Sequence, residues 1–514
     1  MSDYPRSASG KSPEDAVIIT IDAGTTGVRA FAVDTSGQPV GRTYREFTQY
    51  FPQPGWVEHD AAEIWSVTRA VVGELVESLG RTVATVGVTD QRETVVAWDR
   101  RTGVPRHRAI VWQDRRTASR CDDLAAAGEL LRIRALTGLV LDPYFSASKL
   151  EWLLGPGGVA ADDDLLLGTI DSWLVWNLTG GAAHVTDPSN ASRTMLFDIR
   201  ACGWSADLCD LFGIPLSALP RVAPSAGHFG TTVEGSGLPA GVAICGVAGD
   251  QQAALFGQAC VRPGMAKNTY GTGSFVLMNV GETCPEPTAG LLTTIAWAVP
   301  ASMLGGTGSD PVTQYALEGS IFATGAAVQW LRDGLGIISE AAEVGALAAS
   351  VPDSSGVVVV PAFTGLGSPY WDPYARGTVL GITRGAGRAQ LARAVVESMA
   401  FQTRDVVQAM TEASGEALDE LRVDGGAAAM DLLLQIQADQ LGVPVARSSV
   451  AETTALGASY LAGLGSGMWS NLDDIARCWT ADARVDPTPD RGRADAEYAQ
   501  WLRGVERSRD WAET

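Results

Sequence analysis

The sequence predicts an α/β protein with two domains, and three observations lead to this prediction. First, 514 residues exceed what a single hydrophobic core usually supports. Second, short β-branched runs alternate with segments of helical periodicity, which is typical of α/β architectures. Third, a strand–turn–strand pattern near the N-terminus has a topological counterpart after Pro263, without a sequence repeat.

The first half begins with a strand, a small-residue turn and a second strand. The β-branched run from Ala16 to Ile21 predicts the first strand, and the apolar stretch from Val28 to Val33 the second, on either side of the turn Asp22 to Gly27. Helical periodicity follows from Ile64 to Leu79. A further strand, Val83 to Val88, leads directly into Thr89-Asp90-Gln91-Arg92-Glu93.

The second half has a comparable order of predicted strands, turns and helices. Its predicted elements are a strand from Met265 to Tyr270, a turn from Gly271 to Ser274, a strand from Phe275 to Val280, a helix from Gln390 to Met410, a short strand from Leu421 to Val423 that ends in Asp424-Gly425-Gly426, and a helix that starts near Ala429. We therefore expect a polar leader over residues 1–15, a first domain over 16–261 and a second over 262–507.

Composition and charge exclude several classes of protein. With 46% hydrophobic residues the chain can bury large cores, and its net charge of -21 would repel nucleic acid and anionic lipid. No apolar run approaches the roughly 18 residues that a membrane span needs, so we expect a cytoplasmic protein without stable membrane association. Seven cysteines without C-x-x-C spacing fit neither a disulfide framework nor a zinc site.

Three turns built of Gly, Thr, Ser and Ala directly follow predicted strands. They are Asp22 to Gly27, Gly271 to Ser274 and Asp424 to Ala428. Small residues let backbone N–H groups and hydroxyls approach phosphate oxygens closely. None of the three is a P-loop or a G-x-G-x-x-G site, and each taken singly is more often a tight connection without a ligand. Together, on both sides of a domain boundary, they predict a cleft that closes on a nucleotide.

The chain resembles the sugar and polyol kinases, the FGGY family, from about residue 17 to about residue 510. This resemblance implies an actin-like ATPase (ribonuclease H-like) fold, with two similar α/β domains and the active site in the interdomain cleft. The blocks that carry it are Pro54 to Asp60, Gln91 to Thr94, Ala109 to Gln113, Thr137 to Leu139, Asp142 to Ser146, Asn190 to Phe197, Ala248 to Gln258, and Pro361 to Gly381.

The same resemblance implies ATP-dependent phosphorylation of glycerol to sn-glycerol 3-phosphate, with the polyol mainly on the first domain. Asp250 is then the general base, because a glycerol hydroxyl does not ionise at neutral pH unaided; such a base typically contributes about 10²–10⁴-fold. Arg92 and Glu93 could instead be a solvated surface pair, but they lie just past a predicted strand, where α/β sheets place ligands. The implied glycerol pocket comprises Arg92, Glu93, Trp112, Tyr144, Asp250, Gln251 and Phe275.

ATP would bind mainly to the second domain. Asp22 would lie near Mg²⁺, through water, because Mg²⁺ keeps much of its hydration. The family usually has Gln, Ser and Asn where Ala23, Gly27 and Met430 stand, so we expect weaker or less purine-selective nucleotide binding. The implied nucleotide contacts are Thr25, Thr26, Gly27, Arg29, Thr272, Gly325, Gln329, Gly426 and Met430.

Two alternatives remain open at this point. One is a kinase of the same family that acts on a pentulose or a longer polyol. The other is an actin-like or chaperone-like ATPase without small-molecule chemistry, because a fold does not determine a function. We expect glycerol and ATP as ligands, no nucleic acid, and a homo-oligomer, either a dimer or a tetramer.

Overall fold

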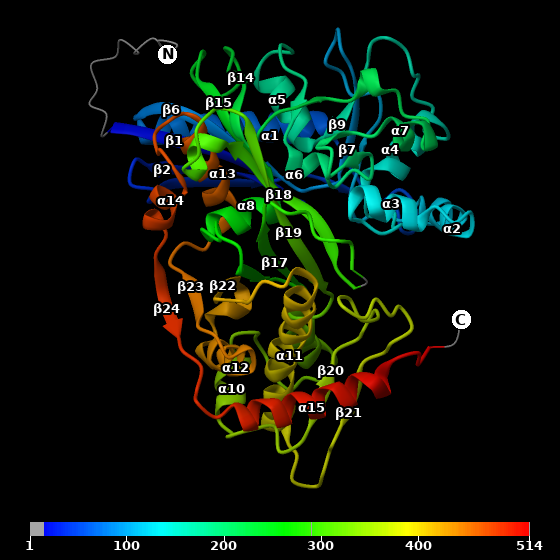
Figure 1. Cartoon of the computed structure of the whole chain (residues 1–514), viewed down its shortest axis with the longest axis vertical. Helices are drawn as coiled ribbons and strands as arrows, with labels where there is room; N and C mark the ends of the chain where they lie inside the picture. The colour runs from blue at the N-terminus through cyan, green and yellow to red at the C-terminus, as the bar shows by residue number, and fades with distance from the viewer. Residues whose placement is uncertain (1–14, 289, 513–514) are drawn as a thin grey trace.

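The computed structural model describes residues 15–288 and 290–512, which form two α/β lobes (Figure 1). The predicted leader, residues 1–15, lies outside the described residues except for its last position. The N-terminal part of the chain forms the upper lobe of Figure 1, and the long helix α11 and the C-terminal helix α15 belong to the lower lobe. The predicted α/β fold with two domains is therefore confirmed.

The upper lobe is built on a six-stranded sheet in the order β14-β15-β6-β1-β2-β3. Strands β1, β2 and β3 form an antiparallel meander, while β6 and β15 run parallel to β1. Nearly every residue of β1 is buried, as expected for a strand covered on both faces. The strands are β1 (Ala16–Ala23), β2 (Gly27–Asp34), β3 (Pro39–Glu46), β6 (Thr82–Asp90), β14 (Ala226–Thr231) and β15 (Ala243–Gly249).

The lower lobe contains a seven-stranded sheet in the order β18-β19-β17-β16-β22-β23-β24. Its centre repeats the connectivity of the first sheet, with an antiparallel β16–β17 hairpin and β22 parallel to β16. The strands are β16 (Met265–Tyr270), β17 (Ser274–Gly281), β18 (Leu292–Pro300), β19 (Pro311–Ile321), β22 (Glu420–Gly425), β23 (Val445–Ser448) and β24 (Ala481–Val485).

Helices cover both sheets, and α1, α11 and α12 lie within a few residues of the bounds that the sequence predicts. Asp60 caps the N-terminus of α1 by accepting hydrogen bonds from the N–H groups of Ala62 and Glu63, and Gly80 ends the helix in the left-handed conformation. The longer helices are α1 (Ala61–Leu79), α5 (Ile170–Leu178), α8 (Asp250–Gly257), α11 (Arg388–Ser414), α12 (Asp431–Leu441), α13 (Thr453–Gly465) and α15 (Arg491–Ser508). Among the described residues, no helix combines the length and the apolar character that a membrane crossing requires.

Smaller elements complete both lobes. A five-stranded sheet in the order β4-β5-β8-β7-β9 extends the upper lobe. The remaining strands are β4 (Gln49–Tyr50), β5 (Glu58–His59), β7 (Val95–Asp99), β8 (Ala109–Ile110), β9 (Leu165–Thr169), β10 (Val185–Thr186), β11 (Phe197–Asp198), β12 (Gly203–Trp204), β13 (Arg221–Val222), β20 (Val358–Val360) and β21 (Thr378–Leu380). The remaining helices are α2 (Ala118–Ala126), α3 (Leu130–Thr137), α4 (Ser146–Leu154), α6 (Pro188–Ala191), α7 (Ala206–Leu211), α9 (Gly325–Gln329), α10 (Glu343–Ala349), α14 (Leu472–Cys478) and the 3₁₀ turn η5 (Gly426–Ala429).

Helix α13 lies in the second half of the sequence but packs on the sheet of the first half. Its residues Leu456 and Leu461 share a buried cluster with Ile18 of β1 and Phe31 of β2. In Figure 1 it is drawn among the blue strands of the upper lobe. The division at residue 261 stays a prediction. It separates the two large sheets in the sequence, but α13 comes after it and packs on the first sheet.

Glycines bring α13 and α8 into backbone contact. A Cβ at Gly457 would lie 1.8 Å from the carbonyl oxygen of Ala253, and a Cβ at Gly257 would lie 1.9 Å from that of Thr453. Only glycine permits such an approach. The contact fixes α8, whose first residue is Asp250, against the back of the upper sheet.

Replacing Gly457 by Ala should force the two helices apart. Overpacking typically costs 1–3 kcal/mol, and here the clash is with backbone, so we expect a loss of about 3 kcal/mol in unfolding free energy. Denaturant titration would measure it. Gly492→Ala is the matched control, because that exposed helical glycine has only the Asp490 side chain nearby, at 3.5 Å. Equal stability of Gly457→Ala and native protein would contradict the packing argument.

Candidate active site

Three parallel strands of the upper sheet deliver polar residues to one edge. Asp90 at the end of β6 pairs with Ala23 of β1 on one side and with Gly249 of β15 on the other. Because parallel strands end together, the residues after them meet at the same place, which is where α/β sheets bind ligands. Arg92 and Glu93 follow β6, and Asp250 follows β15.

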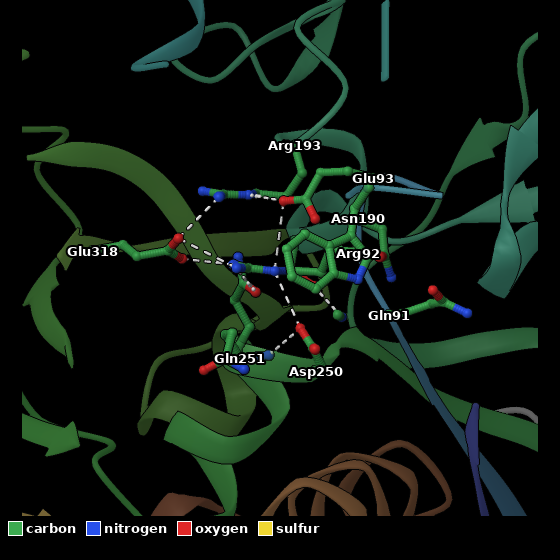
Figure 2. A network of polar contacts seen from close by, with 12 residues as sticks. Gln91, Arg92, Glu93, Asn190, Arg193, Asp250, Gln251 and Glu318 are labelled. Carbon is green, nitrogen blue, oxygen red and sulfur yellow. Dashed lines mark hydrogen bonds and ion pairs between the residues drawn. The ribbon is translucent and has the colours of Figure 1, made fainter. Parts of the chain in front are cut away.

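Arg92 is almost fully buried and joins the two lobes. Its Nη1 donates a hydrogen bond to Glu318 Oε2 at 2.6 Å, and its Nη2 donates to Glu318 Oε1 at 3.2 Å. Glu318 lies on β19 of the lower sheet. Figure 2 shows the paired bonds of this two-point contact between a guanidinium and a carboxylate. The strongest kind of charged hydrogen bond thus spans the boundary between the lobes.

A second arginine completes the network. Arg193 Nε donates to Glu93 Oε1 at 2.7 Å, and Arg193 Nη2 donates to Glu318 Oε1 at 2.9 Å. Burial alone would raise the pKa of Glu318, but the guanidinium groups of Arg193 and Arg92 lower it to about 2. We call Arg92, Glu93, Arg193 and Glu318 the ion network; its four side chains are at most 1% exposed.

Asp250 lies at the edge of this network. Its Oδ1 is 3.2 Å from Arg92 Nε and accepts a hydrogen bond from the Gln251 backbone N–H at 2.7 Å. Asp250 is the first residue of α8, and Gly249 is the N-cap. Burial raises the pKa of Asp250, and Arg92 opposes this effect. Its side chain is 32% exposed.

Aromatic side chains line the same region. Tyr144 accepts a hydrogen bond from Arg92 Nη2 at 3.2 Å through its hydroxyl oxygen, and its ring lies 5.5 Å from that of Trp112 in an edge-to-face arrangement. The indole N–H of Trp112 donates to Thr25 Oγ1 at 3.0 Å. The structure therefore brings together Arg92, Tyr144, Trp112 and the first small-residue turn.

Gln251 contacts the lower lobe, and Phe275 is part of that lobe. Gln251 Oε1 accepts a hydrogen bond from Lys267 Nζ of β16 at 2.6 Å, which is a second contact between the lobes. Phe275 of β17 is half-buried, stands opposite Thr269 in the β16–β17 hairpin and packs near α8. Phe275 makes no hydrogen bond or ring contact with Arg92, Tyr144 or Trp112 in the part of the chain that the structure describes.

The first turn carries the Asp22–Arg29 ion pair. Arg29 Nη1 donates to Asp22 Oδ2 at 2.9 Å, while burial raises the pKa of Asp22 and Arg29 partly offsets the rise. Thr26 is exposed, and its Oγ1 lies 3.3 Å from the Tyr44 hydroxyl. A Cβ at Gly27 would lie 2.6 Å from that hydroxyl and 2.6 Å from the Arg45 carbonyl oxygen, so this position accepts only glycine while Tyr44 stays in place.

The other two turns lie at one edge of the lower sheet, because Tyr270 of β16 pairs with Gly425 of β22. Thr272 accepts hydrogen bonds from the N–H groups of Thr324 and Ala326 through its carbonyl oxygen, at 2.9 Å each, and the N–H of Gly325 donates to Gly271. Thr272 and Gly325 are thus neighbours.

The remaining predicted nucleotide residues are spread over the lower lobe. Gly426 is exposed in η5, Gln329 is exposed at the end of α9, and Met430 is half-buried. A Cβ at Gly345 of α10 would lie 3.2 Å from Met430 Cγ, so Met430 packs on that helix. No hydrogen bond joins Gln329, Gly426 or Met430 to the ion network among the described residues.

Two members of the ion network, Arg193 and Glu318, are not among the residues predicted from the sequence. Arg193 lies inside the block Asn190 to Phe197, which carries the family resemblance. Glu318 is the single charged residue in the apolar run Tyr315-Ala316-Leu317-Glu318-Gly319. A charge within a buried strand requires a partner, and this signal could have identified Glu318 as a network residue.

Replacing Glu318 by Gln should destabilise the protein strongly, because Arg92 and Arg193 would lose their common carboxylate. Removing one partner of a buried ion pair costs about 3–5 kcal/mol. Thermal and denaturant unfolding would measure the loss. In the control Asp473→Asn, which breaks the exposed pair with Arg262, we expect a change below about 1 kcal/mol. Similar stabilities of the two variants would contradict this account.

Known proteins resemble the whole chain. Residues 17–257 match the N-terminal domain of the FGGY family of carbohydrate kinases, and residues 266–466 match its C-terminal domain. Glycerol kinase of Aromatoleum aromaticum is 56% identical over 96% of this chain and 99% of its own length, and that of Dechloromonas aromatica is 53% identical over 97% and 98%. The crystal structure of Plasmodium falciparum glycerol kinase with ADP is 34% identical, with a TM-score of 0.90 over 96% of this chain and 98% of that one. The chain therefore belongs to the FGGY family of carbohydrate kinases.

Proposed function

We propose that the chain phosphorylates glycerol with ATP and releases sn-glycerol 3-phosphate and ADP. Relatives named glycerol kinase that are more than half identical over nearly the full length support this activity. The observation that supports this chemistry is the difference in solvent exposure among the three carboxylates around Arg92. In the described chain Glu93 and Glu318 are at most 1% exposed, whereas Asp250 is 32% exposed. Asp250 is the most accessible of the three, and we therefore assign it as the base.

In this proposal Asp250 accepts the proton of the glycerol hydroxyl as its oxygen attacks the terminal phosphorus of ATP in line with the leaving ADP. One O–P bond forms, the bond to ADP breaks, and the proton resides on the Asp250 carboxylate. The bond from the Gln251 N–H and the contact with Arg92 hold Asp250 in one orientation. Alignment and charge neutralisation supply most of the remaining acceleration in phosphoryl transfer.

We assign the other glycerol contacts by their chemistry. Arg92 donates to glycerol hydroxyl oxygens and Glu93 accepts from hydroxyl groups, while Tyr144 and Gln251 complete the polar contacts. Trp112 and Phe275 supply an apolar wall for the carbon chain. This assignment is supported by the bonds among Arg92, Tyr144, Trp112 and Thr25, which tie the pocket to the first turn.

On the nucleotide side, ATP use follows from the family, and we propose that both lobes hold the phosphates. Thr25, Thr26, Gly27 and Arg29 form one half of that site, and Thr272 the other. Gly325, Gln329, Gly426 and Met430 line the nucleoside.

Mg²⁺, when bound, neutralises phosphate charge. No group of three or more His, Cys, Asp or Glu residues within the described ranges could hold a metal by itself. This fits an ion held by phosphates and water with Asp22 nearby, because Mg²⁺ commonly takes only one or two protein carboxylates.

Three further proposals concern the whole molecule. We propose that residues 16–261 and 262–507 are the two domains, with α13 crossing from the second to the first. We also propose a homo-oligomer, a dimer or a tetramer, that acts in the cytoplasm, where ATP is available. Size-exclusion chromatography with light scattering would give the subunit number.

Glycerol-dependent ADP formation by the native protein tests the function directly. Glycerol should be turned over faster than xylulose or longer polyols, because the aromatic wall restricts the pocket to a short chain. Faster turnover of xylulose would favour a ketose kinase of the same family. ADP formation without any polyol, with growth of light scattering in ATP, would favour an actin-like ATPase.

Replacing Asp250 by Asn should abolish most of the turnover, because the amide cannot accept the hydroxyl proton. We expect kcat to fall by about 10²–10⁴-fold with a modest change in glycerol affinity. Steady-state kinetics and a direct glycerol-binding measurement would separate the two effects. A variant that keeps more than half of the native kcat would remove Asp250 from its role as the base.

Replacing Met430 by Asn should strengthen ATP binding and sharpen the preference for purines, since the added amide can hydrogen-bond a base. Removing or adding one such bond typically changes binding by about 1 kcal/mol, so we expect the KM for ATP to fall roughly fivefold. Kinetics with ATP, GTP and CTP would measure both effects. Equal constants for native protein and variant would refute the proposed role of Met430.

A further inference from the structure

The chain uses arginine almost wherever it needs a positive charge. Of its 38 Lys and Arg residues, only Lys11, Lys149 and Lys267 are lysines. Two of these three, Lys149 and Lys267, are fully buried. A buried ammonium is costly unless it is fully paired, so a chain that otherwise uses arginine retains lysine where a compact donor is needed.

Both buried lysines contact residues of the proposed glycerol pocket. Lys149 Nζ donates hydrogen bonds to the carbonyl oxygens of Pro143, Tyr144 and Phe145, at 2.8, 2.6 and 2.8 Å, and so holds the segment that carries Tyr144. Lys267 Nζ donates to Gln251 Oε1 at 2.6 Å and to Thr269 Oγ1 at 3.0 Å. The lysine of the lower lobe therefore contacts a pocket residue of the upper lobe.

The contact with Lys267 determines which way the Gln251 amide faces. An ammonium group has donors and no acceptor, so the atom of Gln251 next to Lys267 must be the carbonyl oxygen. The NH₂ group then lies on the other branch of the amide. Among the described residues, the Gln251 Nε2 atom has no hydrogen-bond partner, and Gln251 is half-buried and lies next to Asp250 (Figure 2).

We propose that Lys267 is a positioning residue that fixes the Gln251 amide so that its NH₂ group, and not its carbonyl oxygen, faces bound glycerol. This inference rests on the proposed function and deepens it. With the amide fixed, Asp250 accepts a proton from one hydroxyl while Gln251 donates to the oxygen of another. Without Lys267 the amide is free to rotate, and either end can face the substrate.

The main test is Lys267→Met, which keeps the apolar stem and removes the donor. A hydrogen bond to a charged group typically contributes enough to change affinity by tenfold or more, so we expect the KM for glycerol to rise roughly tenfold. The KM for ATP should change little. Thr269→Val is the matched control, because it removes the other acceptor of Lys267 and keeps the bond to Gln251; its KM for glycerol should stay within about twofold of the native value.

Two diols separate positioning from a general loss of structure. Propane-1,2-diol and propane-1,3-diol each lack one glycerol hydroxyl, and their inhibition constants against glycerol report binding. If Gln251 donates to one hydroxyl, the Lys267→Met penalty should disappear for the diol that lacks it and persist for the other. An equal penalty for glycerol and both diols would overturn the proposal.

Gln251→Glu gives an independent answer if Lys267→Met does not fold. This variant keeps an oxygen next to Lys267 but replaces the NH₂ group by a second oxygen, so glycerol binding should fall by at least tenfold, as in Gln251→Leu. Native-like glycerol binding by Gln251→Glu would overturn the proposal. Failure of the proposed function is distinguishable, because the native protein would then form no ADP in response to glycerol.

Discussion

The bidentate contact between Arg92 and Glu318 is the constraint on which the site depends. It places a carboxylate from the lower sheet against a guanidinium from the upper sheet, where both are buried. Separating them would leave charges without partners in a region that water does not reach.

Backbone contact between α8 and α13 provides the complementary constraint. Gly457 and Gly257 allow the two helices to touch, and α13 in turn covers the upper sheet. Asp424, at the end of β22, accepts hydrogen bonds from Gln258 just after α8 and from Thr453 at the start of α13. The helix that carries Asp250 is thus tied both to its own sheet and to the edge of the other sheet where the predicted nucleotide turns lie.

The strands could be predicted from the sequence because they depend on local signals. Ala16 to Ile21 is a β-branched and apolar run, whereas Met265 to Tyr270 also contains Lys267 and Asn268. Both end in small-residue turns, and both form strands. Glu318 and the position of α13 could not be predicted in this way. Tertiary packing determines which residue becomes the partner of a buried charge. It also determines which sheet an Ala- and Gly-rich helix covers. Periodicity and turn chemistry report only local structure and predict neither. Similarly, the sequence does not show that the Tyr44 hydroxyl fills the space beside Gly27.

The carboxylates around Arg92 differ in environment, and in the proposed mechanism they have different roles. Glu318 contacts two guanidinium groups, which hold its pKa at about 2. Its negative charge therefore has a structural role, because it pairs with both arginines. Asp250 contacts Arg92 but keeps 32% of its side chain exposed, and burial raises its pKa. A carboxylate with a raised pKa is the stronger proton acceptor, provided that it is still ionised at neutral pH. Neighbouring acids whose pKa values are moved in opposite directions are a common way to separate a structural charge from a catalytic one. In the proposed mechanism Arg92 therefore serves both roles, because the guanidinium that pairs with Glu318 also contacts Asp250.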